Sequence, residues 1–395
     1  MRKKLAAFIL IIMISLPAYC IGFGYHVFKV RTDPSFSIGN WELPISTLYQ
    51  FNFPVPDLVE GSATSFSFRL DNGLEYRKLR QDPETGAPIN PLNHPYPIDY
   101  MVLYDEFNFA LSQGLVHMDF NDEDLITLNV LVGGRFESAF ENFDYYSDAY
   151  HKEGVFHTIG KNEKGESVIA DREPFGSSFL PGTPELSGDR TMFEINLSAG
   201  IDINLMKDEI TSRNGIRLSS WIRVSPSWLN FFSDRSDYLL WWTRLDLAWT
   251  LFSIPLSDEL STLSMMLSNS TEYRFISGNK VPSYIQGGEI WQAEALSSEH
   301  VITNRTELTL FGPQLFAPDV YPYASAFFCM AYSFGNVLNS DSLKLDGNLA
   351  ASYGVRAEVV LFNVARVYYE IGAVSYSDGW GKSNLIQRFG FALGV

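Results

Sequence analysis

Charged residues at alternate positions near the C-terminus are the first candidates for a functional site in this 395-residue chain. If these side chains meet inside one structure, they form a charged constriction that selects solutes. Arginine and glutamate almost balance among them, so a network of ion pairs that braces the interior is the simpler interpretation. The C-terminal candidates are Arg305, Glu307, Arg356, Glu358, Arg366, Glu370 and Arg388, and an earlier segment adds Arg244 and Asp246.

Other residue types that carry chemistry lack the spacing that their chemistry requires. The six histidines are scattered and form no His-Glu-x-x-His pair, and no Gly-x-Ser-x-Gly or phosphate-cradling glycine loop is present. The acids Asp119, Asp122, Glu123 and Asp124 could bind Ca²⁺, but without spaced ligands they are better explained as a solvated turn. We therefore predict no enzymatic activity, no metal and no cofactor.

The elements that must position these charges are strands. In residues 192–205, Phe193, Ile195 and Leu197 share one face while Glu194 and Asn196 share the other, because successive side chains of a strand point to opposite faces. A charge facing lipid would cost ~2–4 kcal/mol, which explains why arginine and glutamate keep to one face. The same period of two recurs in residues 125–133, 216–225, 239–250, 301–310, 345–360, 365–373 and 385–395.

The length of these segments predicts a particular all-β fold. A tilted membrane strand needs ~9–11 residues, whereas strands of soluble sheets have about five or six. We predict a closed antiparallel transmembrane β-barrel of about 12–16 strands, with long external loops at 80–99, 136–190 and 277–299. A soluble β-sandwich is the alternative. Weaker strands are expected at 63–70 and 74–80, separated by a short turn at Asp71, Asn72 and Gly73.

Composition excludes several classes of protein. The formal net charge of −17 argues against binding nucleic acid. A mean hydropathy of −0.03 is too low for a bundle of transmembrane helices, and two cysteines are too few for a disulfide scaffold. An aromatic content of 15% together with this acidity is typical of an outer-membrane barrel.

The N-terminus predicts export through the general secretory pathway. Basic residues at 2–4, an apolar run at 5–16 and the small residues Ala18 and Cys20 form a signal peptide at 1–20. An uncleaved anchor and a lipidated Cys20 are the alternatives. Residues 21–395 would then form the barrel in the outer membrane of a diderm bacterium. Its expected partners are outer-membrane lipid, lipopolysaccharide or glycolipid, and a small solute or a host ligand.

Five segments of the last ~110 residues carry a family resemblance, namely Ile285–Glu289, Asn304–Leu308, Phe334–Val337, Gly354–Glu358 and Arg388–Gly394. They resemble the closing strands of the bacterial surface antigen family, which includes BamA and TamA. The resemblance implies a barrel that acts in transport or envelope biogenesis. Two features depart from the family: no Arg-Gly-aromatic motif follows Gly288, and the acid usual near Ser333 is missing. As a third departure we expect no periplasmic domains before the barrel, because its strands and loops would need all of residues 21–395.

Two further groups of residues have a predicted location. By the same resemblance, Gly287, Gly288 and Trp291 lie on a loop folded into the barrel, although an ordinary flexible loop is the alternative. The tryptophans between 221 and 249 are expected to form an aromatic girdle at the membrane interface.

Three functions remain open from the sequence. The first is a barrel related to the surface antigen family, acting in transport or envelope biogenesis. The second is a passive porin or a channel for hydrophobic substrates. The third is a surface-exposed adhesin that binds through loop 136–190.

Overall fold

The computed structural model describes residues 25–32, 35–37, 40–42, 45–55, 58–78, 99–117, 124–141, 158–161, 167–169, 191–209, 212–230, 236–256, 262–286, 289–290, 293–294, 298–313, 320–338, 344–362, 365–376 and 384–393. The predicted signal peptide lies outside these residues, as does most of the predicted loops 80–99 and 136–190.

Within these ranges the fold is all-β, with thirteen strands of 10 to 19 residues. They are β4 (Ile45–Val55), β5 (Thr64–Lys78), β6 (Asp99–His117), β7 (Asp124–Glu141), β10 (Thr191–Asn204), β12 (Ser212–Ser225), β13 (Asp237–Pro255), β14 (Thr262–Lys280), β17 (Ser298–Phe311), β18 (Val320–Val337), β19 (Lys344–Leu361), β20 (Ala365–Tyr376) and β21 (Asn384–Leu393). Strands of this length agree with the prediction from the period of two.

The remaining elements are short. The strands are β1 (Tyr25–Thr32), β2 (Ser35–Ser37), β3 (Asn40–Glu42), β8 (Thr158–Lys161), β9 (Ser167–Ile169), β11 (Lys207–Glu209), β15 (Glu289–Ile290) and β16 (Ala293–Glu294). The helices are η3 (Ser227–Leu229) and α3 (Ser283–Gln286). No helix among the described residues is both long enough and apolar enough to span a membrane.

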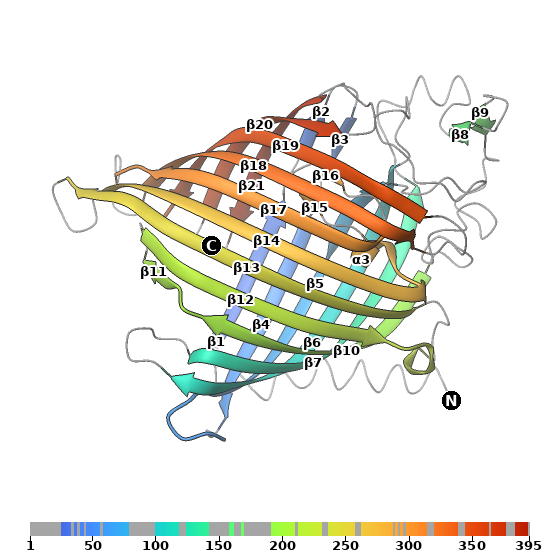
Figure 1. Ribbon diagram of the computed structural model, residues 1–395, viewed down its shortest axis with the longest axis horizontal. Helices are drawn as coiled ribbons and strands as arrows, with labels where there is room; N and C mark the ends of the chain where they lie inside the picture. The colour runs from blue at the N-terminus through green and yellow to red at the C-terminus, as the bar shows by residue number, and fades with distance from the viewer. Residues whose placement is uncertain are drawn as a thin grey trace.

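Each long strand pairs antiparallel with the next one along the chain, from β4 to β21. The sheet curls, so that β12, β13 and β14 lie in front of β4, β5 and β6 (Figure 1). The short strand β1 pairs through eight residues with β4 and through three residues with β21. The first and last parts of the described chain therefore meet along one line of the sheet.

Connections at the two ends of the sheet differ in length. Residues 118–123, 256–261 and 362–364 connect strands at one end, whereas 79–98, 142–190 and 281–297 connect them at the other. Most residues of the predicted loops lie outside the described ranges, and the described strands extend into the edges of those loops. β7 continues to Glu141, β14 ends at Lys280, and β17 begins at Ser298.

The predicted turn at Asp71, Asn72 and Gly73 is wrong, because all three residues lie within the continuous strand β5. Thr47 Oγ1 donates a hydrogen bond of 2.6 Å to Asn72 Oδ1 across the β4–β5 pair. A Cβ atom on Gly73 would lie 2.4 Å from the carbonyl oxygen of Ile45, so glycine permits close approach of two strands here. Turn-forming residues therefore serve strand pairing at this position.

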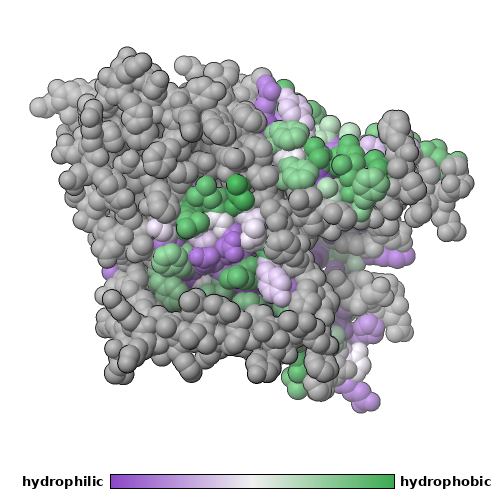
Figure 2. Space-filling view, turned by 180° about the vertical axis from the view of Figure 1, so that it is seen from behind, coloured by the Kyte–Doolittle hydropathy of each residue, from purple (hydrophilic) through white to green (hydrophobic). Residues whose placement is uncertain are grey.

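Apolar and polar side chains are separated between the two faces of the curled sheet. On the outer face Val130, Ile222 and Val355 are each more than half exposed, and apolar side chains form patches on the described surface (Figure 2). On the inner face Glu194 and Glu370 are fully buried. This separation positions the charged residues discussed next.

Candidate functional site

The structure brings the seven C-terminal candidates together on the inner face of the sheet. Strands lie ~4.8 Å apart, so inward side chains of neighbouring strands come within pairing distance. Arg305 and Glu307 lie on β17, Arg356 and Glu358 on β19, Arg366 and Glu370 on β20, and Arg388 on β21.

Five of these residues form a continuous series of ion pairs, which we call the C-terminal network. Arg366 Nε lies 2.9 Å from Glu358 Oε1, and Arg356 Nη1 lies 3.6 Å from Glu358 Oε2. Arg356 also pairs with Glu370, whose Oε2 lies 3.7 Å from Arg388 Nη1. Because a buried carboxylate requires partners, the fully buried Glu370 depends on these arginines.

A cavity of about 190 Å³ lies against this network. Its charged lining residues are Glu307, Arg356, Glu358 and Arg366. Glu307 Oε2 also lies 2.8 Å from Arg305 Nη2, so the carboxylate on the β17 side of the cavity is itself paired. The cavity therefore has charged walls in which the opposite signs are already in contact.

The other predicted site residues are not part of this network. Arg244 and Asp246 lie on β13, which β14 separates from β17, and they pair with each other at 2.9 Å. Gly287, Gly288 and Trp291 lie outside the described residues.

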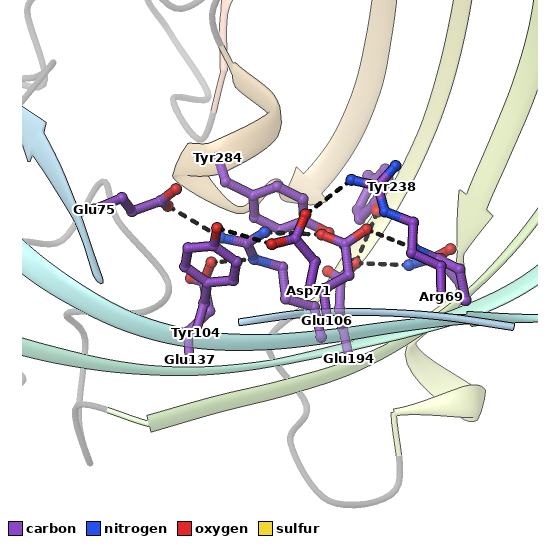
Figure 3. A network of polar contacts seen from close by, with 12 residues as sticks. Arg69, Asp71, Glu75, Tyr104, Glu106, Glu137, Glu194, Tyr238 and Tyr284 are labelled. Carbon is purple, nitrogen blue, oxygen red and sulfur yellow. Dashed lines mark hydrogen bonds and ion pairs between the residues drawn. The ribbon is translucent and has the colours of Figure 1, made fainter. Parts of the chain in front are cut away.

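A second charged site surrounds Arg135 on β7, and the sequence analysis did not single it out. The guanidinium lies 3.0 Å from Glu75 Oε1, 2.8 Å from Glu106 Oε2 and 2.5 Å from Glu137 Oε1. These carboxylates come from β5, β6 and β7 (Figure 3). Only 6% of the Arg135 side chain is exposed, so one buried cation holds three strands together.

Two tyrosine rings pack against the same guanidinium. Arg135 Cζ lies 4.2 Å from the ring centre of Tyr104 and 4.3 Å from that of Tyr284, which is within the range of a cation–π contact. Tyr104 belongs to β6, whereas Tyr284 belongs to α3. The Arg135 site therefore ties α3 to the inner wall.

Glu194 on β10 provides the second attachment of α3. Its carboxylate accepts hydrogen bonds from Ser236 Oγ at 2.9 Å, from Tyr238 at 3.0 Å and from the Tyr284 hydroxyl. Burial and the nearby Glu194 carboxylate raise the pKa of Tyr284 well above its usual value, so the hydroxyl stays protonated and donates. We call Arg135, Glu194 and Tyr284 the α3 anchor; Glu194 and Tyr284 are labelled in Figure 3.

Apolar packing completes the attachment of α3. Val281 and Ile285 are buried against Leu240, Ile276 and Leu338 in one hydrophobic cluster. Residues 281–286 thus lie inside the curled sheet at the end that carries the long connections.

The predicted aromatic girdle is divided between the two faces. Trp228, Trp241 and Trp249 are 73%, 41% and 48% exposed, as a girdle requires. Trp221 and Trp242 instead stack with their ring centres 6.1 Å apart and their planes 9° apart. They occupy the inward positions of β12 and β13, where Trp242 packs against the hydrophobic cluster beside α3.

Asp124, from the predicted acidic turn, makes two contacts beside the short connection between β6 and β7. Its Oδ2 accepts a hydrogen bond of 3.0 Å from the Ala63 amide, and its Oδ1 lies 3.3 Å from His117 Nδ1. The other three acids of that turn lie outside the described residues.

Comparison with known proteins gives no family model and no curated protein that matches this chain. Solved structures give similarities at low identity. The chain is similar to BamA from Haemophilus ducreyi lacking POTRA domains 1–3, at 11% identity and a TM-score of 0.43, over 94% of this chain and 70% of that one.

It is also similar to CdiB from Escherichia coli and CdiB from Acinetobacter baumannii. The identities are 10% and 12%, and the TM-scores are 0.46 and 0.41. Both comparisons cover 93% of this chain, which spans only 62% and 60% of the two CdiB chains. Over most of its length, then, the chain is similar to solved bacterial structures that are longer than itself.

Proposed function

We propose that this chain is an integral outer-membrane β-barrel of a diderm bacterium that moves small solutes across that membrane without enzymatic chemistry. One observation carries the proposal: large apolar side chains are exposed on the outer face while Glu137, Glu194 and Glu370 are buried on the inner face. Soluble proteins rarely expose large contiguous apolar patches. Lipid around the sheet would cover the apolar outer face, as in known barrels.

Closure of the sheet is part of this proposal. In lipid every backbone donor and acceptor must be paired, and a closed ring achieves this. The pairing of β1 with both β4 and β21 supports closure, with β1 as the fourteenth strand. Barrels of this class have short periplasmic turns and long external loops, so we place α3 near the external end.

The contents of the interior favour a restricted passage over an open pore. The α3 anchor holds residues 281–286 inside the sheet, and the C-terminal network lies on the inner face of β19, β20 and β21. Solute flux would therefore depend on displacement of α3 or on passage beside it.

Insertion as a barrel is tested by extraction and by gel migration. We expect the protein to require detergent for extraction and to migrate differently in SDS gels before and after boiling. Identical migration together with extraction by salt alone would contradict the membrane assignment.

Transport is tested by recording in planar bilayers. We expect small discrete conductance steps from the wild type, and larger or more frequent openings from Tyr284→Phe, because that variant loses the hydroxyl bound to Glu194. Tyr369→Phe on the outer face is the matched control, since its hydroxyl contacts Gln387 instead. A barrel that is sealed in both the wild type and Tyr284→Phe would refute transport.

Envelope biogenesis is the second candidate function, and the resemblance of the C-terminal segments to the surface antigen family favours it. Depletion of the protein would then lower the levels of other outer-membrane proteins. The adhesin alternative depends on residues 136–190, most of which lie outside the described residues, and it remains a prediction.

A further inference from the structure

We propose that the cavity beside the C-terminal network binds a small zwitterion, a molecule with one carboxylate and one ammonium group close together. This inference rests on the proposed transport function and names its substrate class. The cavity volume of about 190 Å³ is smaller than the ~300–1,000 Å³ of sites for drug-sized ligands, so a ligand the size of a free amino acid fits best.

The charges around the cavity favour a zwitterion over a simple ion. Two arginines and two glutamates line it, so their formal charges cancel. An anion or a cation alone would meet as much repulsion as attraction on entering. Arg366 and Glu358, with Nε and Oε1 2.9 Å apart, form a dipole on the wall. A zwitterion can lie antiparallel to this dipole, which pairs both of its charges at once.

Both members of this wall dipole have bonding capacity for a ligand. A guanidinium carries five N–H donors, and the contact of Arg366 with Glu358 involves its Nε. The Arg366 side chain is 42% exposed, so the rest of its donor edge is accessible. A carboxylate has about four acceptor sites, and Glu358 has contacts with Arg366 and Arg356. We therefore assign the ligand carboxylate to Arg366 and the ligand ammonium to Glu358.

The apolar residues that line the cavity indicate the chemistry of the uncharged part of the ligand. Phe311 and Tyr323 line the cavity with their ring centres 4.9 Å apart and their planes at 88°. An edge-to-face pair of this kind offers an apolar surface to an aliphatic side chain. An α-amino acid with an aliphatic side chain, such as L-leucine, combines this surface with the two charges.

The location of the cavity fits a passage. Phe311 is the last residue of β17, at the end of the sheet that carries the short connections, whereas α3 follows the opposite end of β14. A solute that entered from the α3 side would thus reach this cavity after passing the α3 anchor.

The experiment is calorimetric titration of the detergent-folded full chain with three probes of similar shape. L-Leucine carries both charges, 4-methylpentanoate only the negative charge, and 3-methylbutylamine only the positive charge. We expect L-leucine to bind at least ~10-fold more tightly than either analogue, because each analogue leaves one charged group of the cavity unmatched. Equal or absent binding of the three probes would overturn the zwitterion assignment.

A variant locates the binding site. Arg366→Gln should weaken L-leucine binding at least ~10-fold, whereas Arg244→Gln should leave it unchanged, since Arg244 pairs with Asp246 away from the cavity. Heat-dependent gel migration verifies folding of each variant, and the wild-type probe preference stands even if Arg366→Gln fails to fold. Bilayer conductance without L-leucine binding would remove this assignment and keep the transport proposal. L-Leucine binding by a sealed barrel would remove the transport proposal and keep the assignment of the zwitterion site.

Discussion

Arg135 pairs with carboxylates from three strands, β5, β6 and β7. Its guanidinium contacts Glu75, Glu106 and Glu137 and packs against Tyr284 of α3. Because Glu137 is fully buried, its charge has no water to replace a lost partner. The residue therefore matters both for the wall and for the helix held against it.

Replacement of Arg135 should be strongly destabilising. Removing one partner of a buried ion pair typically costs about 3–5 kcal/mol, so Arg135→Leu should lower the free energy of unfolding by that order. Arg69→Leu is the control, because Arg69 is 48% exposed and such pairs contribute about 0–1 kcal/mol. Urea unfolding in lipid vesicles, followed by tryptophan fluorescence, measures both. If Arg135→Leu lowers the free energy of unfolding as little as Arg69→Leu does, the Arg135 site is not structurally important.

The sequence predicted one charged site and missed the other for a physical reason. In the C-terminal network the partners lie on strands that follow one another closely in the chain, so alternation alone places them together. The three carboxylates around Arg135 also lie on successive strands, β5, β6 and β7, but the turn predicted at 71–73 and the loop predicted from residue 136 interrupt two of these strands. Tyr284 of α3 is the distant partner, and a period of two carries no information on such a contact.

At the scale of the element, side chains point alternately to the two faces of each strand, so the two faces differ in chemistry. On β7, Val132 is exposed on the outer face, whereas the adjacent Leu131 points inward. Neighbouring residues of a strand therefore face different solvents if lipid surrounds the sheet.

A charge introduced on either face of β7 tests this arrangement. Val132→Arg should lower stability in vesicles by ~2–4 kcal/mol, because its guanidinium would face lipid near the middle of the strand. Leu131→Arg should cost less, since its side chain faces the polar interior. The measurement is the urea midpoint of each variant in vesicles. A larger loss for Leu131→Arg would reverse our assignment of the two faces.

Glycine positions allow large rings to lie flat on the strands. A Cβ atom on Gly200 of β10 would come within 2.2 Å of the Trp221 ring on β12. Gly200→Val should thus displace Trp221 from its stack with Trp242 and cost about 1–3 kcal/mol as an overpacked site. Near-ultraviolet circular dichroism of the tryptophans monitors the displacement. An unchanged spectrum and unchanged stability would exclude the predicted clash.

Element boundaries were the less predictable part of the fold. The turn expected at Asp71–Gly73 rested on residue types that favour turns, yet cross-strand partners satisfy them within β5. Similarly, the predicted loop begins at residue 136, but Glu137 still lies on β7. Its side chain points inward, as does that of Arg135. Alternation was the more reliable signal at both places.

At the scale of the whole molecule, the proposed closure depends on a short pairing between the two ends of the sheet. β1 shares three residue pairs with β21, and Val30 lies opposite Leu393. Directly opposed residues of antiparallel strands have Cα atoms ~4.5–5.5 Å apart, which a disulfide can span.

A cysteine pair tests this closure. In a Cys329→Ser background, Val30→Cys combined with Leu393→Cys should form an intramolecular disulfide under mild oxidation. The control pair, Val30→Cys with Phe391→Cys, is two residues out of register and should cross-link much less. Gel migration with and without reductant reports the product. Absence of the cross-link in the folded protein would mean that the sheet remains open along this line.

Chemical labelling of the buried Cys329 thiol can measure how fast the folded sheet opens around it. It lies on β18 with 0% of its surface exposed, and the other cysteine of the chain, Cys20, falls within the predicted signal peptide. A water-soluble maleimide should therefore react with the protein from residue 21 onward only when the wall around β18 opens. The rate of labelling at high reagent concentration would then equal the opening rate, read from the natural sequence without an added probe.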